Sequence, residues 1–246
     1  MGIVLKNIDC LDLLRSIPDG SIDLMLQDPP YAVTNCDWDK PINLSQMWLE
    51  WERVVKPNGA FVFTATQPFT SKLVISREGF FKYCWVWDKK MVSSPANAKI
   101  QPLRAHEDIV VFYRSQCTYN PIKRKNVLSP FGKQTATNSK VAGKLGDKGN
   151  FGVGYPKSIL TFPRPNNLTD GGLHPSQKPI DLMRYLIKTY SNPGETVFDG
   201  YSGSGTTAIA CIKENRNFIG SELNKEYFDK SMERISHALS KPELFV

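Results

Sequence analysis

A glycine-rich turn restricts the fold of this chain more than any other sequence feature. Residues 197–208 read Val-Phe-Asp-Gly-Tyr-Ser-Gly-Ser-Gly-Thr-Thr-Ala, so three glycines follow an apolar run and precede a helical pattern. Glycines at a strand-to-helix turn let a nucleotide-like cofactor approach the backbone, which is typical of α/β proteins. The turn is no phosphate-binding GxxxxGK[ST] loop, because Thr206 stands where the lysine must be. The spacing of Gly203, Gly205 and Ala208 does match a dinucleotide fingerprint, so a nicotinamide oxidoreductase stays open.

Apolar runs and helical patterns alternate along the chain. Strands are predicted at residues 22–27, 60–64, 83–88, 108–113, 196–198 and 217–221, and helices at 44–55, 179–191, 208–212 and 228–235. This alternation predicts an α/β fold with a mostly parallel sheet and helices on both faces. A chain of 246 residues, 41% of them hydrophobic, can bury the core of one large domain. We therefore expect one domain in two halves, residues 1–114 and 171–246, with an insertion at residues 115–170.

Several classes of protein are excluded by what the sequence lacks. No run approaches the ~20 consecutive apolar residues that cross a bilayer, and the first residues show no secretory signal. We therefore expect a cytoplasmic protein that does not contact a membrane. The five cysteines are scattered and form no CxxC pair, which argues against a disulfide framework and against a zinc site.

The positive charge of the chain is concentrated in residues 115–165. This segment holds nine basic residues and one acidic residue, a net charge of +8, whereas the rest holds 22 basic and 23 acidic residues. Its cations alternate with aromatic residues, which favours a segment that binds a polyanion with stackable bases. The alternative is a solvated loop that binds nothing. Because it has six glycines and little aliphatic periodicity, we expect it not to continue the sheet but to recognise a target. The cations expected to contact this polyanion are Lys123, Arg124, Lys125, Lys133 and Lys140.

The tetrad Asp28-Pro29-Pro30-Tyr31 ends a strand that we expect to lie beside the glycine-rich one. Ligands of open α/β sheets bind outside the carboxyl ends of such strands. Two successive prolines make a stiff turn whose carbonyls are free to accept hydrogen bonds. The Asp28 carboxylate and the Pro29 carbonyl could together hold an exocyclic amino group of a base for alkylation, while Tyr31 stacks on the base outside the duplex. A plain turn after a strand is the alternative.

Taken together, these motifs resemble the amino-group DNA methyltransferases that use S-adenosylmethionine, and the resemblance covers nearly the whole chain. The Asp-Pro-Pro-Tyr tetrad comes first, the basic segment second and the glycine-rich turn last, which is similar to the β group of that family. Residues 174–179, His-Pro-Ser-Gln-Lys-Pro, are similar to the family's HPxxKP cofactor motif. The resemblance implies a Rossmann-like methyltransferase fold with a small irregular target-recognition insertion.

The resemblance also implies a set of site residues. The glycine-rich turn would wrap the methionine part of the cofactor, Glu222 would hold the ribose, and Asp9 would meet the adenine. The cofactor set is Asp9, Cys10, Asp28, His174, Ser176, Lys178, Pro179, Asp199, Tyr201, Gly203, Ser204, Gly205, Thr206, Glu222 and Leu223, and the catalytic set is Asp28, Pro29, Pro30 and Tyr31. Gly200 and Tyr201 stand where the family usually has Pro-Phe, a departure that concerns the fine geometry of the cofactor.

One further motif, His106-Glu107, opens the strand at residues 108–113. A zinc-binding HExxH motif is excluded because Val110 replaces the second histidine, and no other metal site is expected. His106 is either structural or on the side of the base.

The resemblance implies an N6-adenine DNA methyltransferase, because the tetrad begins with Asp28 and the family's cytosine enzymes more often carry Ser there. An N4-cytosine enzyme and a catalytically idle DNA-binding relative are the alternatives. A nicotinamide oxidoreductase would leave the basic segment without a purpose. DNA is the expected partner, and a homodimer and a restriction endonuclease with the same recognition site are further expectations by analogy.

Overall fold

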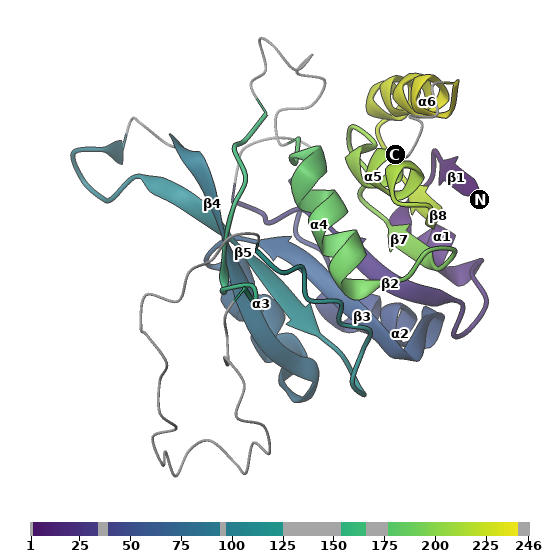
Figure 1. The fold of residues 1–246 in the computed structure, drawn as a ribbon, viewed down its shortest axis with the longest axis horizontal. Helices are drawn as coiled ribbons and strands as arrows, with labels where there is room; N and C mark the ends of the chain where they lie inside the picture. The colour runs from purple at the N-terminus through teal and green to yellow at the C-terminus, as the bar shows by residue number, and fades with distance from the viewer. Residues whose placement is uncertain (1, 34–38, 94–96, 125–153, 166–176, 241–246) are drawn as a thin grey trace. The chain divides into compact units, whose positions relative to one another are not determined.

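The structure, a computed structural model, describes residues 2–33, 39–93, 97–124, 154–165 and 177–240. Within them lies one sheet with the strand order β1-β8-β7-β2-β3-β5-β4-β6 (Figure 1). The strands are β1 (Ile3–Lys6), β2 (Ile22–Gln27), β3 (Val55–Ala65), β4 (Phe81–Ser93), β5 (Arg104–Phe112), β6 (Ile159–Thr161), β7 (Thr196–Asp199) and β8 (Asn217–Ser221). The helices are α1 (Cys10–Arg15), α2 (Leu44–Val54), α3 (Phe69–Ser76), α4 (Ile180–Tyr190), α5 (Thr206–Lys213) and α6 (Lys225–Ser240), with a short 3-10 helix at Glu78–Phe80.

Only one strand of this sheet runs against the others. The strands β1, β8, β7, β2 and β3 pair in parallel, and β6 pairs in parallel with β4. The exception is β5, which is antiparallel to both β3 and β4. The predicted mostly parallel sheet is therefore confirmed.

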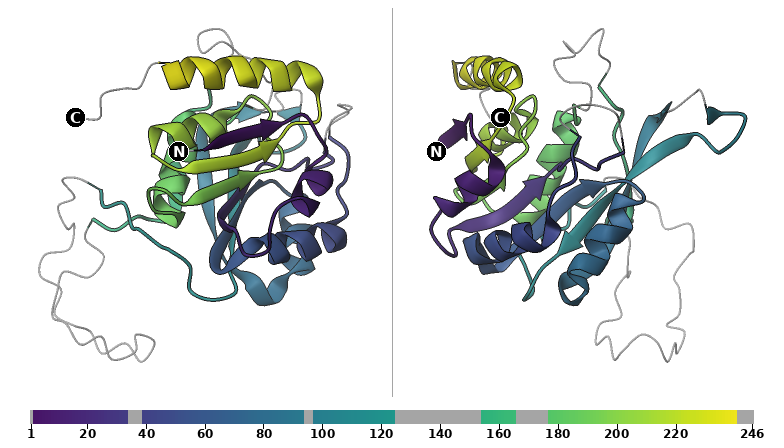
Figure 2. Two further views of the ribbon diagram at one scale, coloured as in Figure 1. Left: turned by 90° about the vertical axis from the view of Figure 1, so that its right-hand side faces the viewer. Right: turned by 180° about the vertical axis from the view of Figure 1, so that it is seen from behind.

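Helices cover both faces of the sheet, as the alternating pattern predicts (Figure 2). On one face α1, α2 and α3 bury a cluster that includes Trp51 and Phe63. On the other face α4, α5 and α6 bury a second cluster, in which Leu186 and Tyr190 of α4 are at most 1% exposed. Each helix buries the apolar stripe that its sequence carries, and this burial drives the assembly of the layers.

The start of α2 is fixed by a local contact, and the chain passes directly from α2 into β3. The helix begins after Asn43, whose side chain accepts a hydrogen bond from the backbone N–H of Gln46. Gly59 lies within β3, where an added Cβ would be 2.5 Å from Cγ1 of Val55 and 2.9 Å from the carbonyl oxygen of Asp23 in β2. Glycine therefore fits the close approach of β3 to β2 at this position.

Several parts of the fold differ from the sequence-based expectation, and β1, α1 and α3 were not among the predicted strands and helices. The strands β4 and β5 extend beyond β3 as a two-stranded hairpin, which Figure 1 shows projecting from the rest of the sheet. The expectation that residues 115–165 do not continue the sheet is wrong for Ile159–Thr161, which form β6 on the edge strand β4. Leu160 explains this because its side chain is 7% exposed and packs into the core.

The chain divides into two units, residues 1–120 with 158–246 and residues 121–157, and of the second unit the structure describes residues 121–124 and 154–157. Within that unit the Lys123 ammonium lies 5.1 Å from the ring centroid of Tyr155, and the Arg124 guanidinium donates to the carbonyl of Tyr155. The unit is narrower than the predicted insertion at 115–170, whose role in recognition stays a prediction. In the described part of the chain no helix is long and apolar enough to cross a membrane.

Candidate active site

The sheet places the two predicted motifs next to each other. β2 pairs in parallel with β7, with Leu24 opposite Val197 and Met25 opposite Phe198. The chain continues from β2 to β3 on one side and from β7 to β8 on the other, so the winding of the sheet reverses between β2 and β7. Ligands of open α/β sheets bind at such a switch point, outside the carboxyl ends of the strands. A cleft of about 970 Å³ lies there and is lined by residues of both motifs.

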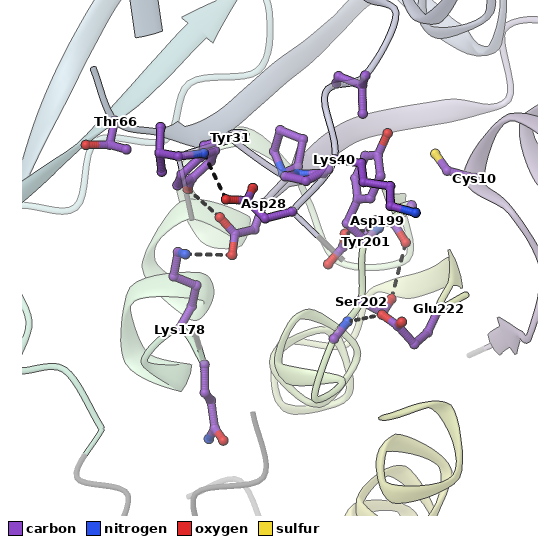
Figure 3. A pocket seen from close by; sticks show the side chains of 18 of the residues that line it. Cys10, Asp28, Tyr31, Lys40, Thr66, Lys178, Asp199, Tyr201, Ser202 and Glu222 are labelled. Atoms are coloured by element: carbon purple, nitrogen blue, oxygen red, sulfur yellow. Dashed lines mark hydrogen bonds and ion pairs between the residues drawn. The ribbon is translucent and has the colours of Figure 1, made fainter. Parts of the chain in front are cut away.

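Most of the residues predicted for the site line this cleft (Figure 3). They are Asp9, Cys10, Asp28, Pro29, Pro30, Tyr31, Lys178, Asp199, Tyr201, Gly203, Ser204, Thr206, Glu222 and Leu223. Gly205 and Pro179 are instead the N-cap residues of α5 and α4 and do not line it. His106 is exposed on β5, also outside the lining. The predicted residues His174, Ser176, Lys125, Lys133 and Lys140 lie outside the described residues.

The carboxylate of Asp28 is held by side chains on both of its oxygens (Figure 3). The hydroxyls of Tyr31 and Thr64 each donate to Oδ1 at 2.5 Å. The ammonium of Lys178 donates to Oδ2 at 2.6 Å. Since these three donors come from the tetrad itself, from β3 and from the residue two positions before α4, folding of the whole sheet is needed to place them.

Asp28 is the first member of a chain of alternating charges. The Lys178 nitrogen lies 2.6 Å from Oδ2 of Asp28 and 3.5 Å from Oε2 of Glu107, and the Lys89 nitrogen lies 3.2 Å from Oε1 of Glu107. The side chains of Lys178 and Lys89 are only 7% and 6% exposed. Burial lowers the pKa of Lys178, but the carboxylates of Asp28 and Glu107 outweigh it and raise that pKa above its ordinary value. Breaking a buried ion pair of this kind costs roughly 3–5 kcal/mol. Removing one of these four side chains should therefore leave its buried partner without a counter-charge.

On the opposite side of the cleft, three carboxylates accept hydrogen bonds from backbone N–H groups. Asp9 accepts from Leu11 at 2.8 Å, and Asp199 accepts from Tyr201 at 3.0 Å. Glu222 accepts from Gly203 at 2.8 Å and from Asn224 at 2.8 Å. Each carboxylate oxygen keeps a second lone pair, so these acids can still accept from the hydroxyl and amino groups of a nucleoside-bearing cofactor.

Burial controls the ionisation of the groups around the glycine-rich turn. Burial raises the pKa of Asp199 to about 7, although the Thr207 hydroxyl and the Tyr201 N–H, which both donate to it, act in the opposite direction. Burial and the neighbouring Asp9 carboxylate raise the pKa of the Cys10 thiol. Burial and the Asp28 carboxylate likewise raise the pKa of Tyr31, so its hydroxyl stays protonated and remains a donor.

Gly200, which departs from the family's usual proline, is explained by its neighbour. A Cβ at position 200 would lie 2.1 Å from the sulfur of Cys10 and 3.3 Å from Cε1 of Phe198. The thiol at the start of α1 therefore fills the space that a larger residue would need. The departure follows from packing against α1.

Several residues of the cleft were not predicted. Glu107 and Lys89 complete the charge chain, and the ring of Trp87, which is 1% exposed, is part of the lining. Thr64 does not line the cleft but holds Asp28 from β3. The sequence carried no clear signal for them, because Lys89 stands between Asp88 and Lys90, and Glu107 stands between His106 and Asp108. Their pairing could not be read from the sequence because no local spacing links the two positions.

A wound α/β sheet with a glycine-rich turn and a held carboxylate at adjacent strand ends defines a nucleotide-cofactor enzyme of the methyltransferase class. The family model described as DNA methylase matches residues 22–233. The chain therefore belongs to the DNA methylase family of the N6-adenine and N4-cytosine type. The cofactor of this family is S-adenosylmethionine, and the cleft has the size and the acceptors to hold it.

Individual relatives agree with this assignment. The Type II methyltransferase M1.MboII of Moraxella bovis is 26% identical over 92% of this chain and 94% of its own length. The DNA adenine methyltransferase YhdJ of Escherichia coli is 30% identical over 94% of this chain and 81% of its own length. Among solved structures, M1.HpyAVI in complex with SAM is 26% identical and covers 94% of this chain and 99% of its own, with a TM-score of 0.65. The cytosine-N4-specific PvuII DNA methyltransferase, 19% identical, covers 98% and 92% with a TM-score of 0.68 and shares the fold.

Proposed function

We propose that this chain is a site-specific DNA methyltransferase that transfers a methyl group from S-adenosylmethionine to the N6 amino group of adenine. The observation that carries the proposal is the Asp28 carboxylate, fixed by Tyr31, Thr64 and Lys178 in the same cleft as the acids of the glycine-rich side. An acceptor is thus held where a base can meet the cofactor. Such a site works by positioning and electrostatics.

The reaction needs a better nucleophile than a free amino group, because the nitrogen lone pair is delocalised into the base. S-adenosylmethionine supplies an electrophilic methyl group when it is bound. The Asp28 carboxylate and the Pro29 carbonyl accept the two N–H groups of the target and turn its lone pair toward that methyl group. As the nitrogen bonds to the methyl carbon, the carbon–sulfur bond of the cofactor would break and leave S-adenosylhomocysteine as a neutral thioether. The methylated nitrogen would then lose one proton, for which the Asp28 carboxylate is the proposed acceptor. Tyr31 stacks on the base once it has left the duplex.

Adenine is favoured over cytosine on two grounds. The tetrad begins with Asp28, whereas the cytosine enzymes of the family more often carry Ser there, and the relative YhdJ is described as a DNA adenine methyltransferase. The alternative is an N4-cytosine enzyme, which the fold shared with the PvuII enzyme keeps open. A catalytically idle relative is disfavoured because Asp28, Tyr31 and Lys178 are all in place.

The purified protein should be incubated with genomic DNA and S-adenosylmethionine, and the modified bases should then be identified by mass spectrometry and mapped by sequencing. We expect 6-methyladenine at one short recognition sequence. Formation of 4-methylcytosine instead would select the alternative substrate. No methylation of any base by a folded protein that binds the cofactor would point to an idle relative.

The basic segment is proposed to bind the DNA. Of its cations, Lys123 and Arg124 lie in the described unit at residues 121–157. If Lys123, Arg124 and Lys125 contact phosphates, replacing all three by Ala should flatten the slope of log K against log salt by up to about 3. Affinity should fall for target and non-target duplexes alike, since phosphate contacts carry no sequence information. An unchanged slope, with cofactor binding intact, would place the DNA elsewhere.

Three further expectations belong to this proposal. The relative M1.MboII is described as a Type II methyltransferase, which supports a restriction endonuclease acting on the same site. A homodimer would let one short recognition segment per chain cover a longer site. Because the substrate is DNA, we expect the protein to act in the cytoplasm.

A further inference from the structure

The Asp28 carboxylate has no oxygen left without a donor. Tyr31 and Thr64 occupy Oδ1, and Lys178 occupies Oδ2. An incoming amino group must therefore share an oxygen or displace a donor. The position of the Lys178 ammonium, 2.6 Å from Oδ2, is the kind of position that a substrate N–H would take.

The ammonium is also the donor that disturbs the reaction most if it stays. The amino nitrogen of the base gains positive charge as the methyl group arrives, and a cation bound to the same carboxylate repels that charge. In addition, an ion-paired carboxylate is a weaker acceptor for the N–H of the substrate than one that is free. The two hydroxyls on Oδ1 are neutral and carry neither penalty.

Glu107 offers the ammonium a second partner within reach. Its Oε2 atom is buried and, among the described residues, receives no well-formed hydrogen bond, although it lies only 3.5 Å from the Lys178 nitrogen. Its Oε1 atom is paired with Lys89 at 3.2 Å, which anchors the carboxylate. A shift of less than about 1 Å would bring the Lys178 ammonium to the usual length of a charge-assisted hydrogen bond with Glu107.

We propose that Glu107 is a positioning residue that takes over the Lys178 ammonium from Asp28 when the target base enters, so that Oδ2 of Asp28 accepts the amino N–H. The inference rests on the proposed function, since it assumes that Asp28 receives the amino group. The net charge of the four side chains does not change in this step, because the ammonium only moves from one carboxylate toward the other. Lys178 is thus a placeholder for the substrate, and its release is part of each catalytic cycle.

The first test is the Glu107→Gln variant, which keeps the shape of the side chain and removes its charge. The ammonium then has no anion to move to and stays on Asp28, so we expect kcat to fall about tenfold at pH 7 while the Kd for S-adenosylmethionine stays within about twofold. The carboxylates that act on Lys178 are those of Asp28 and Glu107, and the Tyr31 ring lies 5.8 Å away. With one carboxylate lost, Lys178 gives up its proton more readily, so the deficit in kcat should shrink at least about threefold between pH 7 and pH 10.

A double-mutant cycle separates this role from a merely structural one. Lys178→Met removes the ammonium, so adding Glu107→Gln to it should change kcat by less than about twofold. A structural role of Glu107 would instead cost the same with and without Lys178. Glu107→Asp, which withdraws the carboxylate by one methylene group, provides a second variant and should show a smaller deficit with the same pH trend.

Glu214→Gln is the matched control. Glu214 is similarly buried, its side chain being 10% exposed, and it is paired with Arg184 at 2.6 Å, but it lies outside the cleft. Its variant should keep the kcat and the pH profile of the parent. A Glu107→Gln enzyme with unchanged kcat and pH profile overturns the inference. Asp28→Ala, assayed in parallel, tests the proposed function separately: if that variant is inactive while Glu107→Gln is silent, only the role of Glu107 fails.

Discussion

The two sides of the cleft hold their carboxylates by different means. On the side of the glycine-rich turn, Asp9, Asp199 and Glu222 all accept from backbone N–H groups, and the Thr207 hydroxyl of α5 also donates to Asp199. On the other side, Asp28 and Glu107 are held by hydroxyl and ammonium groups of side chains. Backbone donors move only if the chain moves, whereas side-chain donors can change partners. The first arrangement suits a cofactor that must bind in one fixed pose, and the second suits a group that must be exchanged for substrate in every turnover.

The difference also separates what each side contributes to the reaction. Removing a carboxylate from the backbone-held side should weaken binding of the cofactor or change the stability of the turn. Removing one from the side-chain-held side should slow the chemical step. Variants at matched positions on the two sides can test whether the two effects are separate.

The largest effect is expected for Asp28→Ala. The carboxylate acts on the amino group in the transition state, so we expect kcat to fall by about 100-fold or more, while binding of DNA and of S-adenosylmethionine survives. Single-turnover methylation and calorimetric binding would measure the two quantities. Because Lys178 loses one of its two partners, Asp28→Asn serves as a second variant with the same shape. Retention of more than about a tenth of the parental kcat, or a loss that appears only in cofactor affinity, would contradict the division.

The second largest effect is expected at Asp199, on the pH dependence of the free energy of unfolding. Its pKa in the folded protein is about 7, above the ordinary value of 3.8, so the folded state holds the proton more tightly than the unfolded state. The contribution of this group to the free energy of unfolding is therefore full below about pH 4 and is lost as the pH rises to about 7, by an amount on the order of a few kcal/mol. Asp199→Asn should remove this dependence, because Asn can still accept from the Tyr201 N–H and donate to the Thr207 hydroxyl.

Urea unfolding of the parent and of Asp199→Asn at several values of pH between 4 and 8 would measure this difference. As the pH rises, the free energy of unfolding of the variant should increase relative to that of the parent. Asp12→Asn is a control, since Asp12 forms an exposed pair with Arg15, which contributes little to stability. A parent and an Asp199→Asn variant with parallel pH dependence would show that burial of Asp199 is not linked to stability in this way.

The same contrast explains which parts of the site the sequence reveals. Asp9, Asp199 and Glu222 each accept from an N–H two residues further along the chain, and it is the resemblance to the family that predicted a cofactor-binding role for them. Asp28 was found because two prolines follow it. Glu107 was not found as a partner of Lys178 and Asp28, because those contacts arise only when β5, β2 and the start of α4 meet. The alternation of strands and helices is predictable from local patterns, whereas side-chain pairing across the sheet is not.

A smaller effect is expected for Glu222→Ala. Charge-assisted hydrogen bonds to ribose hydroxyls contribute roughly 1.5–3 kcal/mol, so the Kd for S-adenosylmethionine should rise about 10-fold to 100-fold, with kcat at saturating cofactor little changed. Calorimetry and steady-state kinetics would measure both. Glu222→Gln is a matched variant, because its amide oxygen can still accept from one of the two N–H groups that Glu222 binds. An unchanged Kd in a folded Glu222→Ala protein would remove the ribose site from this strand end.

The smallest effects are expected at Tyr31, where ring and hydroxyl can be separated. The ring is stacked on Phe69 with centroids 5.5 Å apart, and the hydroxyl donates to Asp28. Tyr31→Ala removes both, and loss of stacking on the base alone costs about 1–3 kcal/mol in kcat/KM. Tyr31→Phe keeps the ring and removes one donor, while Thr64 still holds Oδ1, so its loss should be only about 0.5–1.5 kcal/mol. Since the pKa of Tyr31 is raised, the parent should show no loss of activity from ionisation of this hydroxyl up to about pH 10. If Tyr31→Phe lowers kcat/KM as much as Tyr31→Ala does, the tyrosine acts by holding Asp28 rather than by stacking. The donors of Asp28 would then be less free to change partners than proposed.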